Sequence, residues 1–406
     1  MAFVLSSCQT HFVGGWLPWF QTSANRADEL NTIGNAGALY NEVSPFWYGA
    51  HNDAANAQIG VSISPNGAAS SLAPTVAALK AQGLLVIPTV ADGTSAGSMR
   101  TIIGDPARRL VHEQQLVDLT VQNGYDGVDL DYEVFAFGDH IGGAENSVDA
   151  DNWVAFIHDL SGMLHAQGKL LAVTVPPTWQ TQGINVPVIH GYPFYSQSRI
   201  AADVDRLRLM VYDWSVSFPG PMAPMFWDNW VIDYSTNVAH VPAAKLQLGV
   251  PAYGRHWQST KDLVCPDKAL QGIQSMTMKA APGLAAAHGV APVRDPNGSG
   301  EMTFSWNELV TGPRTSPVPP TVTMIPPFII GIAATSDPSG LHQAERLTPP
   351  TTQVTCTVHH TVFYPDAASI QQRATAAMAA GWHGIFIWAL GYETPDTYPA
   401  LSNIGP

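Results

Sequence analysis

The 406-residue sequence predicts an α/β fold, a (β/α)8 barrel whose alternation of strands and helices is interrupted once. Short apolar runs typical of strands alternate along the chain with segments of helical spacing. A stretch of about 100 residues breaks this alternation late in the chain. Hydrophobic residues make up 46% of the sequence, enough for a large core, and the 35 Gly and 32 Pro suit a barrel rich in loops.

Eight strands are expected, most of them short apolar runs. Residues 84–90 form a continuous apolar run, typical of a parallel strand buried on both faces. Helical spacing of apolar residues lies between the strands, and glycines mark two helix ends. The predicted strands are 12–16, 39–48, 84–90, 126–133, 170–175, 207–213, 246–252 and 384–390, and the clearest helices are 107–123, 153–168, 227–240 and 370–380.

Residues 256–360 separate the seventh predicted strand from the eighth. They contain a turn cluster at 295–300, a strand-like run at 302–306 and a proline-rich segment at 313–327. A structureless loop of this length is unusual in a compact domain, so the segment is expected to fold as a subdomain. The predicted boundaries are 10–255 and 361–406 for the barrel and 256–360 for the insertion.

Acids occupy every second position in residues 126–133, Asp-Gly-Val-Asp-Leu-Asp-Tyr-Glu. Side chains alternate between the faces of a strand, so Asp129, Asp131 and Glu133 are expected on one face, about 6.7 Å apart. Carboxyl groups this close in a barrel interior cannot all ionise freely. The pKa of at least one should rise toward neutrality, as a general acid requires. Glu133 comes last, at the C-terminal strand end where barrel active sites open.

Two other interpretations of the acidic stretch remain open. An edge strand could carry the acids toward water, although apolar neighbours such as Val128, Leu130 and Phe135 argue against this. A Mg²⁺ or Ca²⁺ site is the second alternative, because these ions take carboxylate oxygens as ligands. The 14 histidines show no metal-ligand spacing, and we expect neither a metal nor a cofactor.

The acidic stretch matches the DGxDxDxE signature of family 18 glycoside hydrolases, the chitinase family, which the sequence resembles. Further segments resemble this family in the same order along the chain. They are 209–213 (its MxYD strand), 245–255 (its seventh strand), 363–370 (its YDD-x-x-S segment, with Pro365 for the first Asp) and 384–391 (its eighth strand). Residues 219–230 are similar to the branch that includes spore-cortex-lytic N-acetylglucosaminidases.

The resemblance implies a TIM barrel with a small α+β insertion between strands 7 and 8. It also implies a retaining mechanism in which the substrate's own 2-acetamido oxygen is the nucleophile. Glu133 would protonate the leaving glycosidic oxygen and then activate water. Asp131 would orient the acetamido group, Asp129 would share a proton with Asp131, and Tyr212 would donate a hydrogen bond to the acetamido oxygen.

Substrate-binding residues are implied in the same way. Asp213 would support the acetamido pocket, and Trp388 would form the apolar floor under the sugar. Arg255, Tyr48 and Trp214 are further substrate-binding candidates. A purely structural interpretation stands beside each role: a strand end with a helix cap for Tyr212 and Asp213, core packing for Trp388, and ion pairing for Arg255 and Asp366.

Other residues near expected strand ends are less specific candidates. Asp92 follows the third strand where relatives of this branch often carry Asn, which puts the sugar contact from that loop in doubt. Several tryptophans could be either sugar platforms or core residues: Trp16, Trp47, Trp179, Trp214 and Trp257.

The expected function is hydrolysis of β-linked N-acetylglucosamine glycans. Chitin oligomers, peptidoglycan and the core of N-linked glycans all carry the required acetamido group, and exo and endo cleavage are not separated. The main alternative is a non-catalytic glycan-binding, lectin-like barrel. Such relatives usually lack the last acid of the motif, whereas Glu133 is present. A metal-dependent hydrolase is the third candidate.

A net charge of −14 makes nucleic acid a poor partner, and no apolar run reaches the length of a transmembrane helix. We expect a monomer that acts outside the cell or in the cell envelope. Residues 5–8 resemble a lipoprotein cleavage site, so Cys8 is either a lipid anchor or an ordinary free cysteine. Cys265 and Cys356 both lie in the insertion, where a disulfide between them would indicate an oxidising compartment.

Overall fold

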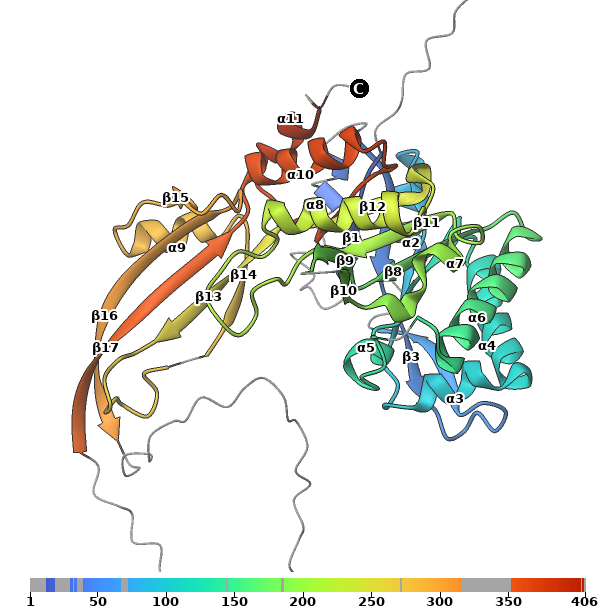
Figure 1. Cartoon of the computed structure of the whole chain (residues 1–406), viewed down its shortest axis with the longest axis horizontal. Coiled ribbons are helices and arrows are strands. Elements are labelled where there is room, and N and C mark those ends of the chain that lie inside the picture. Colours follow the sequence, from blue (N-terminus) through green and yellow to red (C-terminus); the bar gives the residue numbers. More distant parts are fainter. Residues whose placement is uncertain are drawn as a thin grey trace, which may run out of the picture. The chain divides into compact units, whose positions relative to one another are not determined.

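The computed structural model describes residues 12–18, 30–31, 33–34, 39–66, 72–143, 145–183, 186–270, 272–314, 352–402 and 404 (Figure 1). Cys8, the predicted anchor position, lies outside the described residues. The chain divides into two compact units. The first contains Met1–Arg255, Ser275–Phe304 and Val362–Pro406, and the second contains His256–Gln274 and Ser305–Thr361.

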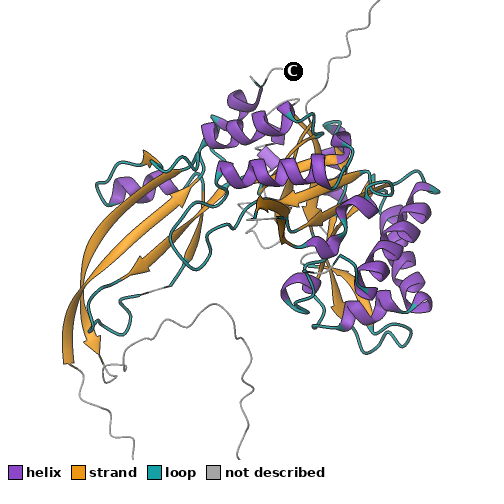
Figure 2. Cartoon of the chain, viewed as in Figure 1, coloured by secondary structure: helices purple, strands orange, loops and turns teal. Residues whose placement is uncertain are grey.

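Parallel strands of the first unit close into a ring, which confirms the predicted TIM barrel. Figure 2 shows helices around these strands. β1 pairs with both β2 and β18, and the remaining strands pair in sequence until β12 meets β18. In ring order the strands are β1 (Phe12–Pro18), β2 (Tyr40–Phe46), β5 (Leu85–Val86) with β6 (Thr89–Asp92), β7 (Gly127–Asp131), β8 (Leu170–Val175), β11 (Arg206–Met210), β12 (Leu246–Pro251) and β18 (Gly384–Trp388). β3 (Tyr48–Asn52) pairs with β6, and the antiparallel strand β4 (Val61–Pro65) pairs with β3.

Helices follow the strands, and the four clearest predicted helices are present. Asp105 and Ser147 begin two of them by accepting hydrogen bonds from backbone N–H groups of the first turn. The helices are α2 (Leu72–Ala81), α3 (Ser98–Gly104), α4 (Pro106–Gln122), α5 (Val134–Phe137), α6 (Val148–His165), α7 (Gln197–Ile200), α8 (Met225–Asp233) continued by a π-helical turn (Tyr234–Val238), α10 (Ala367–Ala379) and α11 (Thr397–Ser402), with short 3₁₀ turns at Pro193–Tyr195 and Ala243–Lys245. An antiparallel hairpin, β9 (Thr178–Gln182) with β10 (Pro187–Gly191), follows β8.

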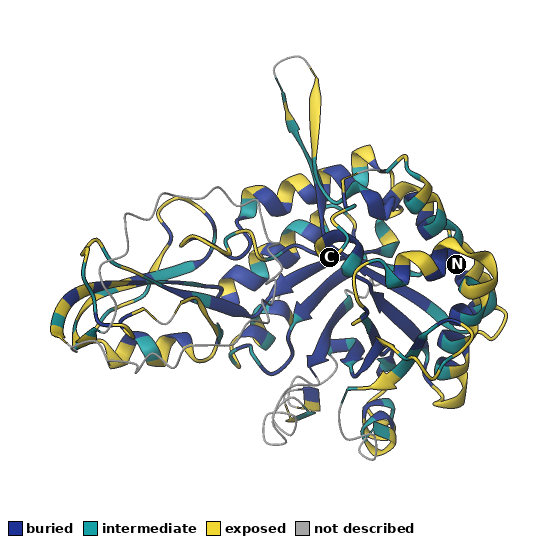
Figure 3. Ribbon diagram, turned by 90° about the horizontal axis from the view of Figure 1, so that it is seen from below, coloured by how far each residue is buried: buried dark blue, intermediate teal, exposed yellow. Residues whose placement is uncertain are grey.

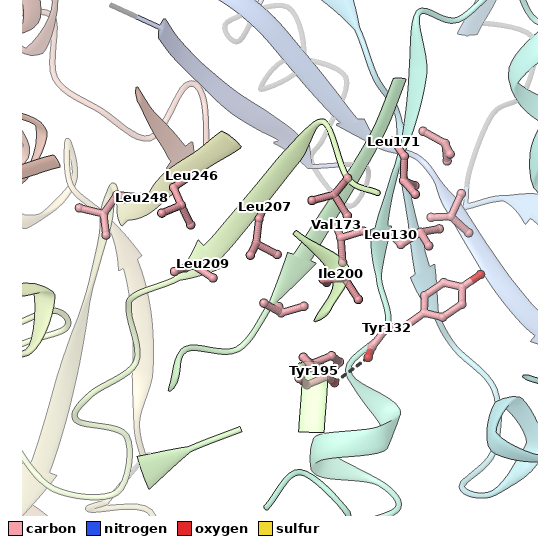
Figure 4. Close-up of a cluster of buried hydrophobic side chains, with 14 of the residues drawn as sticks. Leu130, Tyr132, Leu171, Val173, Tyr195, Ile200, Leu207, Leu209, Leu246 and Leu248 are labelled. Atoms are coloured by element: carbon pink, nitrogen blue, oxygen red, sulfur yellow. Dashed lines mark hydrogen bonds between the residues drawn. The ribbon is translucent and has the colours of Figure 1, made fainter. Parts of the chain in front are cut away.

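The main hydrophobic core lies between the barrel strands and the helices around them. Figure 3 shows the strands buried along their length. Leu130, Val173 and Leu209, from neighbouring strands, are fully buried in one apolar cluster (Figure 4). The Tyr195 hydroxyl donates to the Tyr132 carbonyl at 2.7 Å, so the chain just after β7 is anchored beside this core.

The inside of the barrel is polar. Arg208 is fully buried there, with its guanidinium carbon 3.7 Å from the Phe386 ring centroid. It pairs with Asp129 at 2.9 Å and Glu42 at 3.2 Å, and its Nε donates to Gln247 Oε1 at 2.9 Å. Arg208, Asp129, Glu42 and Gln247 are all inaccessible to solvent. Burial favours a raised pKa at Glu42, but Arg208 and Arg206 outweigh it and hold that pKa below its usual range.

A second sheet has the order β14-β13-β17-β16-β15. Its strands are β13 (Tyr253–Ser259), β14 (Gln274–Thr277), β15 (Val293–Arg294), β16 (Met302–Arg314) and β17 (Thr352–Tyr364), and α9 spans Ala281–Ala287. A disulfide joins Cys265 to Cys356 in the second unit. Cys356 and Val358 form a small hydrophobic core of that unit with Ala269.

Candidate active site

Asp129 is the deepest acid of the motif, and its oxygens are held by donors from four other strands. Its Oδ2 accepts from Trp16 Nε1 at 3.1 Å and Thr89 Oγ1 at 2.8 Å, and it pairs with Arg208 at 2.9 Å. Its Oδ1 accepts from Thr174 Oγ1 at 2.8 Å. This arrangement fixes the carboxyl group. The predicted proton sharing with Asp131 stays a prediction.

Asp131 lies at the end of β7 and is 6% exposed. Its Oδ1 is buried and has no hydrogen-bond partner among the described residues. Burial raises the pKa of Asp131 well above its usual range, and the nearby charges of Glu133, Asp129 and Asp92 raise it further. Asp131 is therefore a buried acid with one oxygen free to accept or donate to a ligand.

Glu133 is not on the strand, contrary to the predicted strand end at residue 133. β7 ends at Asp131, and Glu133 has the helical backbone angles φ −91° and ψ −10°, with its carbonyl accepting from Ala136 and Phe137 at the start of α5. Burial, and then the charge of Asp213, raise the pKa of Glu133 to about 7. From this junction of strand and helix, the side chain of Glu133 lines a pocket.

That pocket has a volume of about 420 Å³. Glu133 lies in its lining together with Tyr212 and Asp213, and aromatic rings of Trp179, Trp214 and Trp227 complete much of the wall. A mostly apolar cavity with a few convergent polar groups is the usual form of a small-molecule site. Glu133 supplies this lining with a carboxyl group whose pKa is about 7.

Tyr212 and Asp213 lie just beyond β11, which ends at Met210 instead of the predicted residue 213. Burial raises the pKa of Tyr212 well above its usual value, so its phenol stays a hydrogen-bond donor. Asp213 has the left-handed φ of 66°, which Asp tolerates better than most residues. It accepts from the Tyr253 hydroxyl and pairs with Arg255 at 2.9 Å. Arg255 thus holds Asp213.

Trp388 lies at the end of β18 and is half-buried. Its ring centroid is 5.2 Å from that of Phe46 and 5.8 Å from that of Trp16. The structure does not bring Tyr48 to the pocket. Its hydroxyl is 2.7 Å from the Tyr125 hydroxyl and its side chain is only 3% exposed, because the ring packs into the main core.

Of the tryptophans that could be sugar platforms, Trp179 and Trp214 line the pocket, whereas Trp16 and Trp47 are core residues.

Asp92 affects the acidic motif through its charge. Burial raises its pKa, and its charge in turn favours a raised pKa at Asp131. Asp366, for which the sequence left ion pairing as a structural alternative, is the N-cap of α10 and pairs with Arg294 at 2.6 Å.

The described residues contain no candidate metal site and no candidate membrane span. No group of three or more His, Cys, Asp or Glu side chains among them has an arrangement that could hold a metal ion. Among the described helices, none combines the length and apolar character needed to cross a bilayer.

A closed (β/α)8 barrel with acids at the carboxyl ends of its strands and an aromatic pocket beside them is an architecture that glycoside hydrolases use. Residues 57–393 match the family model described as Glycosyl hydrolases family 18, and the chain belongs to this family.

Curated relatives match part of the chain. "Putative sporulation-specific glycosylase YdhD" of Bacillus subtilis is 28% identical over 204 residues, which cover 48% of this chain and 44% of that protein. "Chitinase A1" of Niallia circulans is 29% identical over 197 residues, 43% of this chain and 27% of that protein. The matches therefore span less than half the length of these relatives.

Solved structures share the fold over nearly the whole chain. The chitinase from Chromobacterium violaceum has a TM-score of 0.67 at 21% identity, covering 97% of this chain and 98% of that one. The spore cortex-lytic enzyme SleL of Bacillus megaterium has a TM-score of 0.65 at 14% identity, covering 98% and 74%. A chitinase-like agglutinin from Robinia pseudoacacia has a TM-score of 0.63 at 16% identity, covering 97% and 99%.

Proposed function

We propose that this protein hydrolyses β-linked N-acetylglucosamine glycans, with Glu133 as general acid and base. The observation that carries the proposal is a carboxyl group with a pKa of about 7 in a pocket lined by Tyr212 and aromatic rings. A group with this pKa is protonated often enough near neutral pH to donate a proton and ionised often enough to accept one. The names of the relatives, chitinases and a glycosylase, support the same class of substrate.

In the proposed mechanism the sugar supplies the nucleophile. Glu133 donates its proton to the glycosidic oxygen as the acetamido oxygen attacks the anomeric carbon, which gives an oxazolinium ion and a free leaving group. Asp131 binds the acetamido N–H, and the Tyr212 hydroxyl donates to the acetamido oxygen. Glu133, now ionised, takes a proton from the water that opens the ring. The net anomeric configuration is retained.

Turnover of a chromogenic N-acetylglucosamine oligomer tests this function. We expect release of the chromophore, inhibition by a thiazoline mimic of the cyclic intermediate, and no effect of EDTA. Loss of activity with EDTA would favour a metal-dependent hydrolase. Binding of the oligomer without turnover would favour the lectin-like alternative, a class to which the Robinia agglutinin's name points. Mass analysis of products from chitin, peptidoglycan and a glycoprotein would then identify the polymer and the cleavage mode.

The rate should depend on pH through Glu133. Because the free enzyme must hold Glu133 protonated, kcat/KM is expected to fall as the pH rises through about 7. The Asp213 charge contributes to this raised pKa, so Asp213→Asn should move the falling limb to lower pH while also weakening activity. A limb that stays in place in this variant, or a rate that is constant between about pH 6 and 9, would contradict the assignment of Glu133.

We also propose that the protein acts outside the cell or in the cell envelope. The Cys265–Cys356 disulfide supports this location, because structural disulfides persist mainly in oxidising compartments. Fractionation of the native source, with immunodetection in each fraction, tests it. Recovery only from the reducing cytosol would contradict it.

A further inference from the structure

A buried ion cluster joins the turn before β16 to the helices α8 and α10. It consists of Glu301 in the turn, Arg373 on α10 and Asp228 on α8, and all three residues are fully buried. Arg373 pairs with Glu301 at 3.0 Å and with Asp228 at 3.2 Å. One cation therefore serves two acids, and the proposed bond cleavage uses none of the three residues.

Glu301 and Arg373 bind the same short piece of backbone. Glu301 Oε2 accepts from the Met222 N–H at 2.8 Å, and its Oε1 accepts from the Ala223 N–H at 2.7 Å. Arg373 donates to the Ala223 carbonyl. Hydrogen bonds from backbone N–H groups to an ionised carboxylate are roughly twice as strong as neutral ones, so this ion pair fixes the backbone of both residues.

Met222 lies at the end of a loop that begins beyond β11 and forms part of the pocket wall. The Met222 carbonyl accepts from the Trp214 N–H at 2.9 Å, which closes the loop at its base. Trp214 and Val216, within the loop, line the pocket. Residues 214–223 contain no helix or strand, so the shape of the loop depends on contacts such as these.

The turn that carries Glu301 is itself held against α10. The Gly300 carbonyl accepts from Ser369 Oγ at 2.6 Å and from Arg294 Nη1 at 2.9 Å. Gly300 has the left-handed φ of 81°, and a Cβ at this position would lie 2.9 Å from Met225 Cγ. The turn thus packs closely against α8, and Glu301 is firmly placed beneath the end of the loop.

We propose that Glu301 is a positioning residue for substrate binding, which holds the loop so that Trp214 and Val216 keep their places in the pocket wall. This inference rests on the proposed function. Glu301 is not among the residues that line the pocket, so it acts through the backbone of the loop. Loss of this hold should weaken substrate binding more than bond cleavage, which depends on Glu133.

Asp228 supplies a matched control from the same cluster. Neither of its oxygens accepts a hydrogen bond from a described residue, and burial raises its pKa to about 8. It therefore holds a proton at neutral pH, and Asp228→Asn resembles the form already present. Burial also raises the pKa of Glu301, but Arg373 and the two backbone N–H groups oppose this rise. Glu301→Gln removes the charge beside Arg373 and turns an amide NH₂ toward one of those N–H groups.

Steady-state kinetics on a chromogenic N-acetylglucosamine oligomer distinguish the two variants. Glu301→Gln should raise KM by about fivefold or more and leave kcat within about twofold. Asp228→Asn should leave both constants within about twofold. Circular dichroism checks that each variant is folded. If Glu301→Gln does not fold, Glu301→Asp replaces it, because the shorter carboxylate keeps the charge but cannot span both backbone N–H groups.

Fluorine NMR gives a readout that does not need turnover. In protein labelled with fluorotryptophan, the Trp214 signal is the one among the 12 tryptophans that Trp214→Phe removes. Glu301→Gln should shift or broaden this signal, whereas Asp228→Asn should leave it in place.

The outcomes separate this inference from the proposed function. An unchanged KM or an unchanged Trp214 signal in Glu301→Gln would refute the positioning role. Equal effects of Glu301→Gln and Asp228→Asn would make the cluster a general support of the fold and overturn the inference as well. If the parent protein shows no turnover, the proposed function fails, and the Trp214 signal alone decides whether Glu301 holds the loop.

Discussion

Glu133→Gln is expected to lower kcat on a chromogenic N-acetylglucosamine oligomer by about 10²–10⁴-fold, with little change in KM. Glutamine keeps the size and polarity of the side chain but cannot transfer a proton. Glu113→Gln is a matched control. Burial also raises the pKa of Glu113 to about 7, but this residue lies on α4, paired with Arg109 at 3.4 Å and outside the pocket lining. It should keep nearly full activity.

Thermal unfolding of Glu133→Gln shows whether its loss of activity comes from the chemistry or from a loss of folded protein. The pKa of Glu133 is raised from 4.5 to about 7 in the folded protein, so the folded state binds more protons than the unfolded state between these values. Glu133 therefore destabilises the protein progressively as the pH rises from about 4.5 to 7, by up to roughly 3 kcal/mol. Glu133→Gln should melt at the same temperature or higher at pH 8. Full activity in Glu133→Gln would refute the proposed mechanism.

Arg208→Met is expected to cost about 3–5 kcal/mol of unfolding free energy, the largest loss of stability among the changes considered. The change removes the cation between Asp129 and Glu42. Asp129 is then buried without an ionic partner, which is strongly unfavourable, whereas Glu42 keeps its pair with Arg206 at 3.1 Å. Denaturant unfolding at neutral pH measures the effect. Activity should fall as well, because Asp129 underlies Asp131 in the acidic motif.

A surface pair supplies the comparison for this loss. Arg100 pairs with Asp149 at 2.8 Å, but their side chains are 48% and 21% exposed, so Arg100→Met should cost less than about 1 kcal/mol. Similar unfolding free energies for Arg208→Met and Arg100→Met would show that the polar interior of the barrel contributes little to stability.

The barrel and the acidic motif could be predicted from the sequence because each depends on local patterns. An apolar run identifies a buried parallel strand wherever it occurs, and the 126–133 motif holds its acids within one segment. Strand ends were less accessible. The alternation of acidic and apolar residues predicted a strand that continues to Glu133. The strand instead ends at Asp131, and the chain enters α5 at Glu133, where the side chain lines the pocket.

Features built from distant residues could not be predicted. Arg208 meets Glu42 across 166 residues and Gln247 across 39, and no local pattern reveals that these inward-facing positions share one interior. Tyr48 shows how a distant contact can also remove a residue from the predicted site. Its place near a strand end favoured a substrate contact, but the hydrogen bond with Tyr125, 77 residues away, holds it in the core. Trp179, Trp214 and Phe226 likewise come from a hairpin, a loop and a helix that only the folded chain brings together.

The bond between Cys265 and Cys356, which are 91 positions apart in the sequence, makes the backbone between them a closed covalent loop. A protease that cuts once anywhere inside that loop cannot release either fragment, since the two sulfur atoms still join them. Such a nicked molecule would migrate as one species until a thiol reductant is added. Tolerance of a single cut is thus inherent in the covalent connectivity that this disulfide creates.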